Sequence, residues 1–185
     1  MKSIRQSGRR FAAAAIAAIA ITGASAFACA WMQAPASASE ATEANARIVR
    51  EFVEKVYNEG KLELIEKYIA PDFIDSSPGA PPDARGPAFV REQAIGTFAL
   101  FPDLKFKNED VIAEGDRVVV RWSSTSSFTG TAGGVKGDGR PVTVSGISIM
   151  RIADGMIAES WDIVDRMAMF TQMGFTLEPP KEGAE

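Results

Sequence analysis

The chain has 185 residues and a formal net charge of −4; 46% of its residues are hydrophobic and 24% are charged. It has no histidine and a single cysteine, Cys29, which excludes a disulfide bond within the chain and disfavours a transition-metal site. The acidic balance argues against nucleic acid or an anionic membrane as a partner.

The N-terminal segment predicts an export signal peptide. Its basic residues come first, and an Ala-rich stretch without charged residues follows as far as Ser39. We assign residues 1–38 to the signal, residues 39–178 to one folded domain and residues 179–185 to a mobile C-terminal tail. Removal of the signal leaves 16 basic and 24 acidic residues, a net charge of −8, in a protein expected to be periplasmic or extracellular. The basic residues removed are Lys2, Arg5, Arg9 and Arg10.

The export route and the cleavage site are open. Arg9-Arg10 resembles a twin-arginine signal, and an ordinary secretory signal fits equally well. Cleavage between Ala38 and Ser39 removes Cys29 and leaves a domain without thiols. A lipoprotein anchored at Cys29 and an uncleaved membrane helix are less favoured alternatives.

Hydrophobic spacing predicts three helices in the first part of the domain. The apolar residues of 41–58 recur at intervals of three and four positions, as they do on one face of a helix. The same spacing continues through residues 62–69 in a second, short helix that we end at Pro71. A proline-rich loop follows, and Gly86-Pro87 begins a third helix.

Beyond Pro102 the apolar residues alternate with polar ones, which predicts strands. Helices followed by antiparallel strands indicate an α+β fold, in which a cone-shaped, curved antiparallel sheet wraps around the N-terminal helices and leaves a hollow. We expect strands at residues 104–113, 118–128, 142–152 and 156–164, a glycine-rich hairpin loop at 130–139 and a closing helix at 167–173.

The last predicted strand carries a carboxylate among apolar residues. Asp162 lies between Trp161 and Ile163, and burial of its charge should raise its pKa toward neutrality. Because the chain has no histidine, any proton transfer near neutral pH has to use a carboxylate. Alternation along the strand predicts that Ser160 and Val164 face the same side as Asp162, and that Trp161 and Ile163 face the other.

Several short motifs follow one another in a characteristic order along residues 44–174. They are Val56-Tyr57-Asn58-Glu59-Gly60, Tyr68-Ile69-Ala70-Pro71-Asp72-Phe73, Phe101-Pro102-Asp103-Leu104, Ile112-Ala113-Glu114-Gly115-Asp116, Phe128-Thr129-Gly130, Gly139-Arg140-Pro141-Val142, Met150-Arg151-Ile152-Ala153-Asp154-Gly155 and Trp161-Asp162. In order and spacing they resemble the SnoaL-like polyketide cyclases, also called ester cyclases. The resemblance implies the α+β barrel shared with nuclear transport factor 2, ketosteroid isomerase and scytalone dehydratase, usually as a homodimer.

The resemblance also implies a reaction and a set of site residues. In the name-giving cyclases an Asp removes a proton from an activated carbon without a metal or cofactor, and Asp162 falls at that position. Ser76, Phe128, Ser148 and Ser160 occupy positions where relatives often have histidine. The residues expected to bind the ligand or line the cavity are Tyr57, Asp75, Ser76, Trp122, Phe128 and Ser148.

Two hypotheses for function follow. In the first, an apolar pocket holds a small carbonyl-bearing molecule, and Asp162 drives aldol cyclisation, isomerisation or hydration. In the second, the protein binds or carries such a molecule without turnover. A third option, a scaffold domain, requires a filled cavity. The alternative for Asp162 itself is a hydrogen-bonded pocket residue or an ion pair with Arg121 or Arg151.

Overall fold

The structure is a computed structural model that describes residues 38–176 and residue 178. The segment assigned to the signal peptide, apart from Ala38, and the tail at 179–185 lie outside the described residues. None of the described helices is long and apolar enough to cross a membrane.

The first predicted helix is confirmed and begins slightly earlier than expected. Helix α1 (Ala38–Phe52) continues directly into a π-helical turn, η1 (Val53–Asn58). Asn58 ends this helical segment and holds it against the sheet, because its side chain accepts a hydrogen bond from Phe106 N at 2.7 Å and donates one to Phe106 O at 3.0 Å. The end of the first helix is therefore tied to the strand that forms one edge of the sheet.

The second predicted helix is shorter than expected, and a strand follows it. A 3₁₀ turn, η2 (Leu62–Leu64), and a single turn of helix, α2 (Ile65–Tyr68), lead into strand β1 (Ile69–Asp75). Pro71, which we expected to end a helix, lies inside β1. A proline is tolerated there because β1 is an edge strand, where a missing N–H does not interrupt the sheet.

The third and fourth helices agree with the sequence. Helix α3 (Gly86–Leu100) has Pro87 in its first turn. Helix α4 (Arg166–Gln172) begins after Asp165, whose carboxylate accepts a hydrogen bond from Ala168 N at 2.9 Å as an N-terminal cap.

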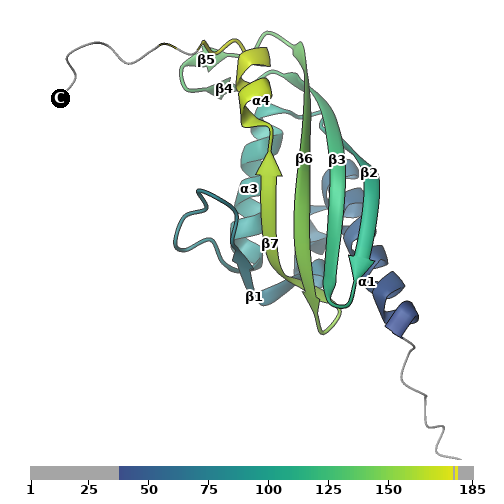
Figure 1. The fold of residues 1–185 in the computed structure, drawn as a ribbon. Coiled ribbons are helices and arrows are strands. Elements are labelled where there is room, and N and C mark those ends of the chain that lie inside the picture. The colour runs from purple at the N-terminus through teal and green to yellow at the C-terminus, as the bar shows by residue number, and fades with distance from the viewer. Residues whose placement is uncertain (1–37, 177, 179–185) are drawn as a thin grey trace, which may run out of the picture. The chain divides into compact units, whose positions relative to one another are not determined.

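The remaining strands form one sheet in the order β1-β7-β6-β3-β2, in which β1 pairs with β7 in parallel and the other pairs are antiparallel. Helices α1 and α3 lie on the same face of this sheet (Figure 1). The glycine-rich loop folds as a small hairpin of its own, as expected. The bounds are β2 (Lys105–Glu114), β3 (Arg117–Phe128), β4 (Thr131–Ala132), β5 (Val135–Lys136), β6 (Arg140–Ala153) and β7 (Met156–Val164). The expected α+β class and curved sheet are confirmed.

Strand pairing decides which residues share a face, because directly opposed residues point to the same side. One row across β3, β6 and β7 joins Val120, Ser148 and Asp162, and it faces the helices. The neighbouring row on the opposite face joins Ile112, Val119, Ile149 and Trp161.

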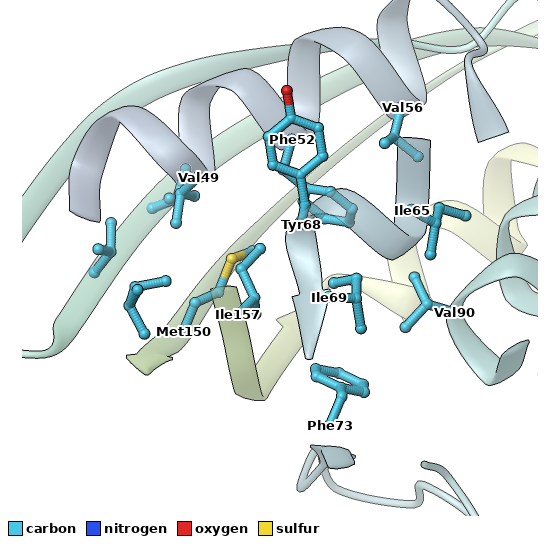
Figure 2. Close-up of a cluster of buried hydrophobic side chains, with 13 residues drawn as sticks. Val49, Phe52, Val56, Ile65, Tyr68, Ile69, Phe73, Val90, Met150 and Ile157 are labelled. Carbon is cyan, nitrogen blue, oxygen red and sulfur yellow. The ribbon is translucent and has the colours of Figure 1, made fainter. Parts of the chain in front are cut away.

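The main core fills part of the space between the helices and the inner face of the sheet (Figure 2). Burial of each large apolar side chain contributes about 1.5–3 kcal/mol relative to exposure. The labelled members are Val49, Phe52, Val56, Ile65, Tyr68, Ile69, Phe73, Val90, Met150 and Ile157. A second buried cluster at the other end of the sheet contains Phe101, Leu104, Phe128, Val142, Val144 and Met173.

Candidate functional site

A cavity of about 290 Å³ lies between the helices and the inner face of the sheet. Its volume is just below the range of about 300–1,000 Å³ that is usual for small-molecule pockets. Aromatic and aliphatic side chains from α1, α3 and the strands form most of its wall. The polar side chains of the wall are those of Tyr57, Asp75, Gln93, Thr97, Asn108, Trp122, Ser148, Ser160 and Asp162.

Asp162 lies in this wall and accepts hydrogen bonds from serine side chains. Ser148 Oγ donates to Asp162 Oδ1. Ser77 Oγ accepts from Asp162 N at 2.9 Å and donates to Oδ2 across a longer distance of 3.4 Å. Trp122 Nε1 in turn donates to Ser148 Oγ at 2.9 Å. The carboxylate is therefore oriented by a chain of donors, and Oδ2 is its less firmly bonded oxygen.

Burial raises the pKa of Asp162 above its ordinary value of 3.8. Hydrogen bonds from Ser148, Ser160 and Ser77 favour the anion and oppose this shift, and the negative charge of Asp75 adds to it. The two arginines considered as ion-pair partners are engaged elsewhere: Arg121 with Asp110 at 2.6 Å, and Arg151 with Glu159 at 3.3 Å. The upward direction expected from the sequence is thus found in the structure.

Tyr57 supplies a hydrogen-bond donor that stays protonated. Burial, together with the nearby charges of Asp162 and Asp75, raises the pKa of Tyr57 to about 12. Its ring is held by aromatic neighbours, with ring centroids 5.6 Å from Phe52 and 5.3 Å from Phe106. A neutral phenol in this position can donate to a ligand oxygen.

Asp75 is the second carboxylate in the cavity wall. It ends β1 and is paired with Ser160 of β7, so the two carboxylate-bearing strands are neighbours. Its Oδ1 accepts a hydrogen bond from Ser77 N at 2.9 Å, and it thereby positions the serine that contacts Asp162. No group of three or more acidic residues that could hold a metal ion occurs within the described part of the chain.

The structure does not bring Ser76 and Phe128 into the cavity. The Ser76 hydroxyl donates to Glu159 at 2.7 Å, and Glu159 shares the outer face of the sheet with Arg151. Phe128 is completely buried in the second core cluster, where its ring centroid lies 5.9 Å from that of Phe101. Both positions were suggested by histidines of relatives, and both are occupied here by residues that stabilise the fold. The other predicted residues, Tyr57, Asp75, Trp122, Ser148 and Asp162, line the cavity together.

Two residues that support the site were not singled out from the sequence. Ser77 is brought to Asp162 by the loop after β1, and no local pattern indicates this contact. Gly146 could have been noticed in the sequence, because a glycine inside a strand often marks a place where another group approaches the backbone closely. A Cβ on Gly146 would collide with the ring of Trp122 and lie 2.7 Å from Ile163 O, so the glycine allows the indole to lie over β6 and reach Ser148.

A curved, unclosed sheet with helices packed on one face and a cavity between them is the architecture of the nuclear transport factor 2-like class of α+β proteins. Within that class the chain belongs to the SnoaL-like polyketide cyclase family, whose family model matches residues 47–173. The resemblance deduced from the short motifs is confirmed.

Solved structures of similar proteins support this assignment. A proposed polyketide cyclase from Acidithiobacillus ferrooxidans is 29% identical, covers 70% of this chain and 94% of its own, and gives a TM-score of 0.64. IdmH, a proposed polyketide cyclase from Streptomyces antibioticus, is 28% identical over 71% of this chain and 99% of its own, with a TM-score of 0.63. AclR, a proposed hydroxylase from Streptomyces galilaeus, is 26% identical over 76% of this chain and 87% of its own, with a TM-score of 0.66. Among curated protein sequences, none matches this chain.

Proposed function

We propose that the cavity binds a small, largely apolar molecule with a carbonyl group, and that Asp162 removes a proton from the carbon next to that carbonyl without a cofactor. The observation that carries the proposal is the placement of Asp162 in the cavity wall with its pKa raised by burial. A carboxylate with a raised pKa is a stronger base than one in water, and a positioned base contributes about a hundred- to ten-thousand-fold to such a step.

The proposed step uses the oxygens and donors already described. Asp162 Oδ2, the less firmly bonded oxygen, takes the proton as the C–H bond breaks, and the electron pair moves onto the carbonyl oxygen to form an enolate. Tyr57 donates a hydrogen bond to that oxygen, because its raised pKa keeps its own proton in place. Return of the proton to another carbon gives isomerisation. Attack of the enolate on a second carbonyl, followed by return of the proton to the new alkoxide, gives aldol cyclisation.

Catalysis of the first step can be measured without knowledge of the natural substrate. 2-Tetralone has an acidic C–H next to a ketone, and its exchange with deuterium in D₂O is followed by NMR. We expect the wild-type protein to accelerate the exchange and Asp162→Asn to lose about a hundredfold or more of that acceleration while 2-tetralone affinity is retained. Asp110→Asn, an exposed carboxylate on the outer face of the sheet, is the matched control. Equal acceleration by Asp162→Asn would remove Asp162 from the mechanism.

A second candidate function is a carrier without turnover. It is favoured by Ser148, which stands where many cyclases have a histidine and which cannot titrate near neutral pH. In this case the wild-type protein binds 2-tetralone without accelerating its exchange. Measurement of 2-tetralone exchange with the wild-type protein therefore distinguishes the two functions.

We infer further that the protein is exported and that it works as a homodimer. The expected signal segment supports export, and N-terminal sequencing of the protein from its own host tests both the export and the cleavage after residue 38. The outer face of the sheet supports self-association, since Ile112, Ile147 and Ile163 on it are exposed by 65%, 46% and 61%.

A further inference from the structure

Asn108 presents a polar group that the described protein does not satisfy. It lies on β2, opposite Trp122, and its side chain is part of the cavity wall. Its Oδ1 is buried and has no hydrogen-bond partner among the described residues. Buried side-chain oxygens are nearly always paired, because an unpaired one loses its hydrogen bonds to water without replacement.

Several polar groups in this part of the fold are committed to other contacts. Trp122 Nε1 donates to Ser148 Oγ, and the Asn58 amide is used by the backbone of Phe106. On the opposite face of the sheet, Glu109 bonds to Ser123 and pairs with Lys107. None of these groups pairs with Asn108 Oδ1, and the cavity that Asn108 lines is the side from which a ligand can reach the amide once it rotates about its Cβ–Cγ bond.

A β-bulge directly follows Asn108 in β2. The register of β2 against β3 shifts between Asn108 and Asp110, which makes Glu109 the extra residue of a β-bulge. Without the bulge, strict alternation would place Val111 on the face opposite to Asn108. With it, Asn108 faces the cavity while Val111 packs against the main core. Bulges are frequent next to functional sites because they redirect a side chain.

Asn108 and Asp162 lie toward opposite edges of the cavity floor. Strands β6 and β3 separate β7, which carries Asp162, from β2. Strands are about 4.8 Å apart, so three steps correspond to at most about 14 Å along the sheet, and to less across a curved one. Between β2 and β7 the cavity wall is formed by Val120 and Trp122 of β3 and by Ser148 and Met150 of β6.

We propose that Asn108 is a second anchoring residue for the ligand: the molecule carries, at the end remote from its carbonyl, a hydroxyl or N–H group that donates a hydrogen bond to Asn108 Oδ1. The inference rests on the proposed function and narrows its substrate class to carbonyl compounds with a donor at the far end. A hydroxyl is the best match, because it both donates and accepts and so fits either orientation of the amide.

Three ligands and two variants test this proposal. The ligands are 2-tetralone, 6-hydroxy-2-tetralone, which adds a donor across the bicycle from the ketone, and 6-fluoro-2-tetralone, which adds a substituent of similar size that cannot donate. The variant Asn108→Leu keeps the branched shape and the number of heavy side-chain atoms and removes the amide. Gln93→Leu removes another amide of the cavity wall, on α3, and is the matched control. Dissociation constants are measured by isothermal titration calorimetry.

The expected result is a preference of the wild-type protein for the hydroxyl compound over the other two by about five- to tenfold, the value of one net hydrogen bond. Asn108→Leu should lose this preference and bind 2-tetralone no more weakly, whereas Gln93→Leu should keep the preference. Binding of 2-tetralone with no hydroxyl preference, or loss of the preference in Gln93→Leu alone, overturns the role of Asn108 and leaves the proposed function intact. Failure of all three ligands to bind the wild-type protein contradicts the proposed function itself, and the role of Asn108 falls with it.

A measurement without ligand checks the premise. If Asn108 is unpaired within the protein, Asn108→Leu should have a urea midpoint equal to or higher than that of the wild type, because an unsatisfied buried group is replaced by an apolar one. A lower midpoint would mean that Asn108 is bonded within the fold, and it would overturn the inference.

Discussion

At the scale of single residues, ionisation of Asp162 is unfavourable in free energy because the folded protein buries its side chain. Burial favours its neutral form, and the folded state therefore binds a proton more tightly than the unfolded chain does. Stability attributable to this group is present at low pH and is lost as the pH rises from 3.8 through the raised pKa. The buried carboxylate of Asp162, which is a strong base for this reason, thus reduces the stability of the protein at neutral pH.

The variant Asp162→Asn should remove this penalty. We expect its urea midpoint at pH 7 to be at or above that of the wild type, and the difference to shrink as the pH falls and to vanish below about 3.8, where Asp162 is protonated in both states. Urea unfolding at a series of pH values measures the difference. Lower stability of the variant at pH 7 would show that hydrogen bonds to the anion outweigh its burial.

The charge of Asp75 should contribute to the raised pKa of Asp162. Its negative charge disfavours ionisation of Asp162, so Asp75→Asn should lower the Asp162 pKa and move the acidic limb of the exchange rate to lower pH. The pH dependence of 2-tetralone exchange gives this midpoint for both proteins. An unchanged midpoint in Asp75→Asn would show that the two carboxylates do not interact. Because Asp75 also accepts the N–H of Ser77, the variant should be checked for an unchanged affinity for 2-tetralone.

At the scale of elements, strand β6 determines how the site is assembled. Ser148 and Gly146 lie two residues apart on the face of β6 that points to the cavity. Ser148 donates a hydrogen bond to Asp162, and the absence of a side chain at Gly146 leaves room for the Trp122 ring. The position of the indole, and through it the orientation of Ser148, depends on the absence of a side chain at Gly146.

Gly146→Ala should therefore disturb the site more than an ordinary glycine substitution. The added methyl group collides with Trp122, and overpacking of this kind costs about 1–3 kcal/mol in the free energy of unfolding. We also expect weaker binding of 2-tetralone, because the hydrogen bond from Trp122 to Ser148 is displaced. Gly96→Ala on α3, where a Cβ meets nothing within 4 Å, is the control and should be neutral or stabilising. Equal effects of the two substitutions would contradict the role of Gly146.

The elements also show what the sequence could and could not predict. Alternation along β7 placed Asp162 and Ser160 on one face and Ile163 on the other, and the pairing confirms it, because a strand with one buried face has a strict period of two. Strand β1 was missed because Ile65 and Ile69 are four residues apart and continue a helical period across the point where the chain becomes extended.

Contacts that depend on tertiary structure could not be predicted from the sequence. Ser77 reaches Asp162 only through the fold of its loop, and Val111 shares the inner face with Asn108 because of the bulge at Glu109, which no periodicity reveals. Ser76 follows Asp75 directly, so alternation sends it to the other side of the sheet, a consequence that required β1 to be recognised as a strand. Local patterns therefore predicted the faces of regular strands and failed where a bulge or a loop changes direction.

At the scale of the whole molecule, the described domain has helices on one face of its sheet and leaves the other face partly apolar. On that outer face Ile147 of β6 and Ile163 of β7 are directly paired and both exposed. An exposed apolar strip of this kind is typical of surfaces that bind another protein. A second copy of the chain is the partner we propose.

The proposed dimer should be sensitive to charge on this strip. Ile147→Lys would place an ammonium group at the interface, and we expect the variant to sediment as a monomer where the wild type sediments as a dimer in analytical ultracentrifugation. Ile95→Lys, at an exposed isoleucine on α3, is the matched control and should remain dimeric. A wild-type protein that is monomeric at all accessible concentrations would refute the proposed homodimer.

The position of β2 at the edge of the sheet has a consequence for how such molecules can associate. Unpaired backbone groups at a sheet edge invite the addition of a further strand and, with it, open-ended stacking of chains. On β2 the exposed side chains of Lys105 and Lys107 and the bulge at Glu109 oppose such addition, through repulsion between like charges and through a backbone that departs from regular extension. The same bulge that brings Val111 to the inner face beside Asn108 thus opposes the addition of a further strand at this edge.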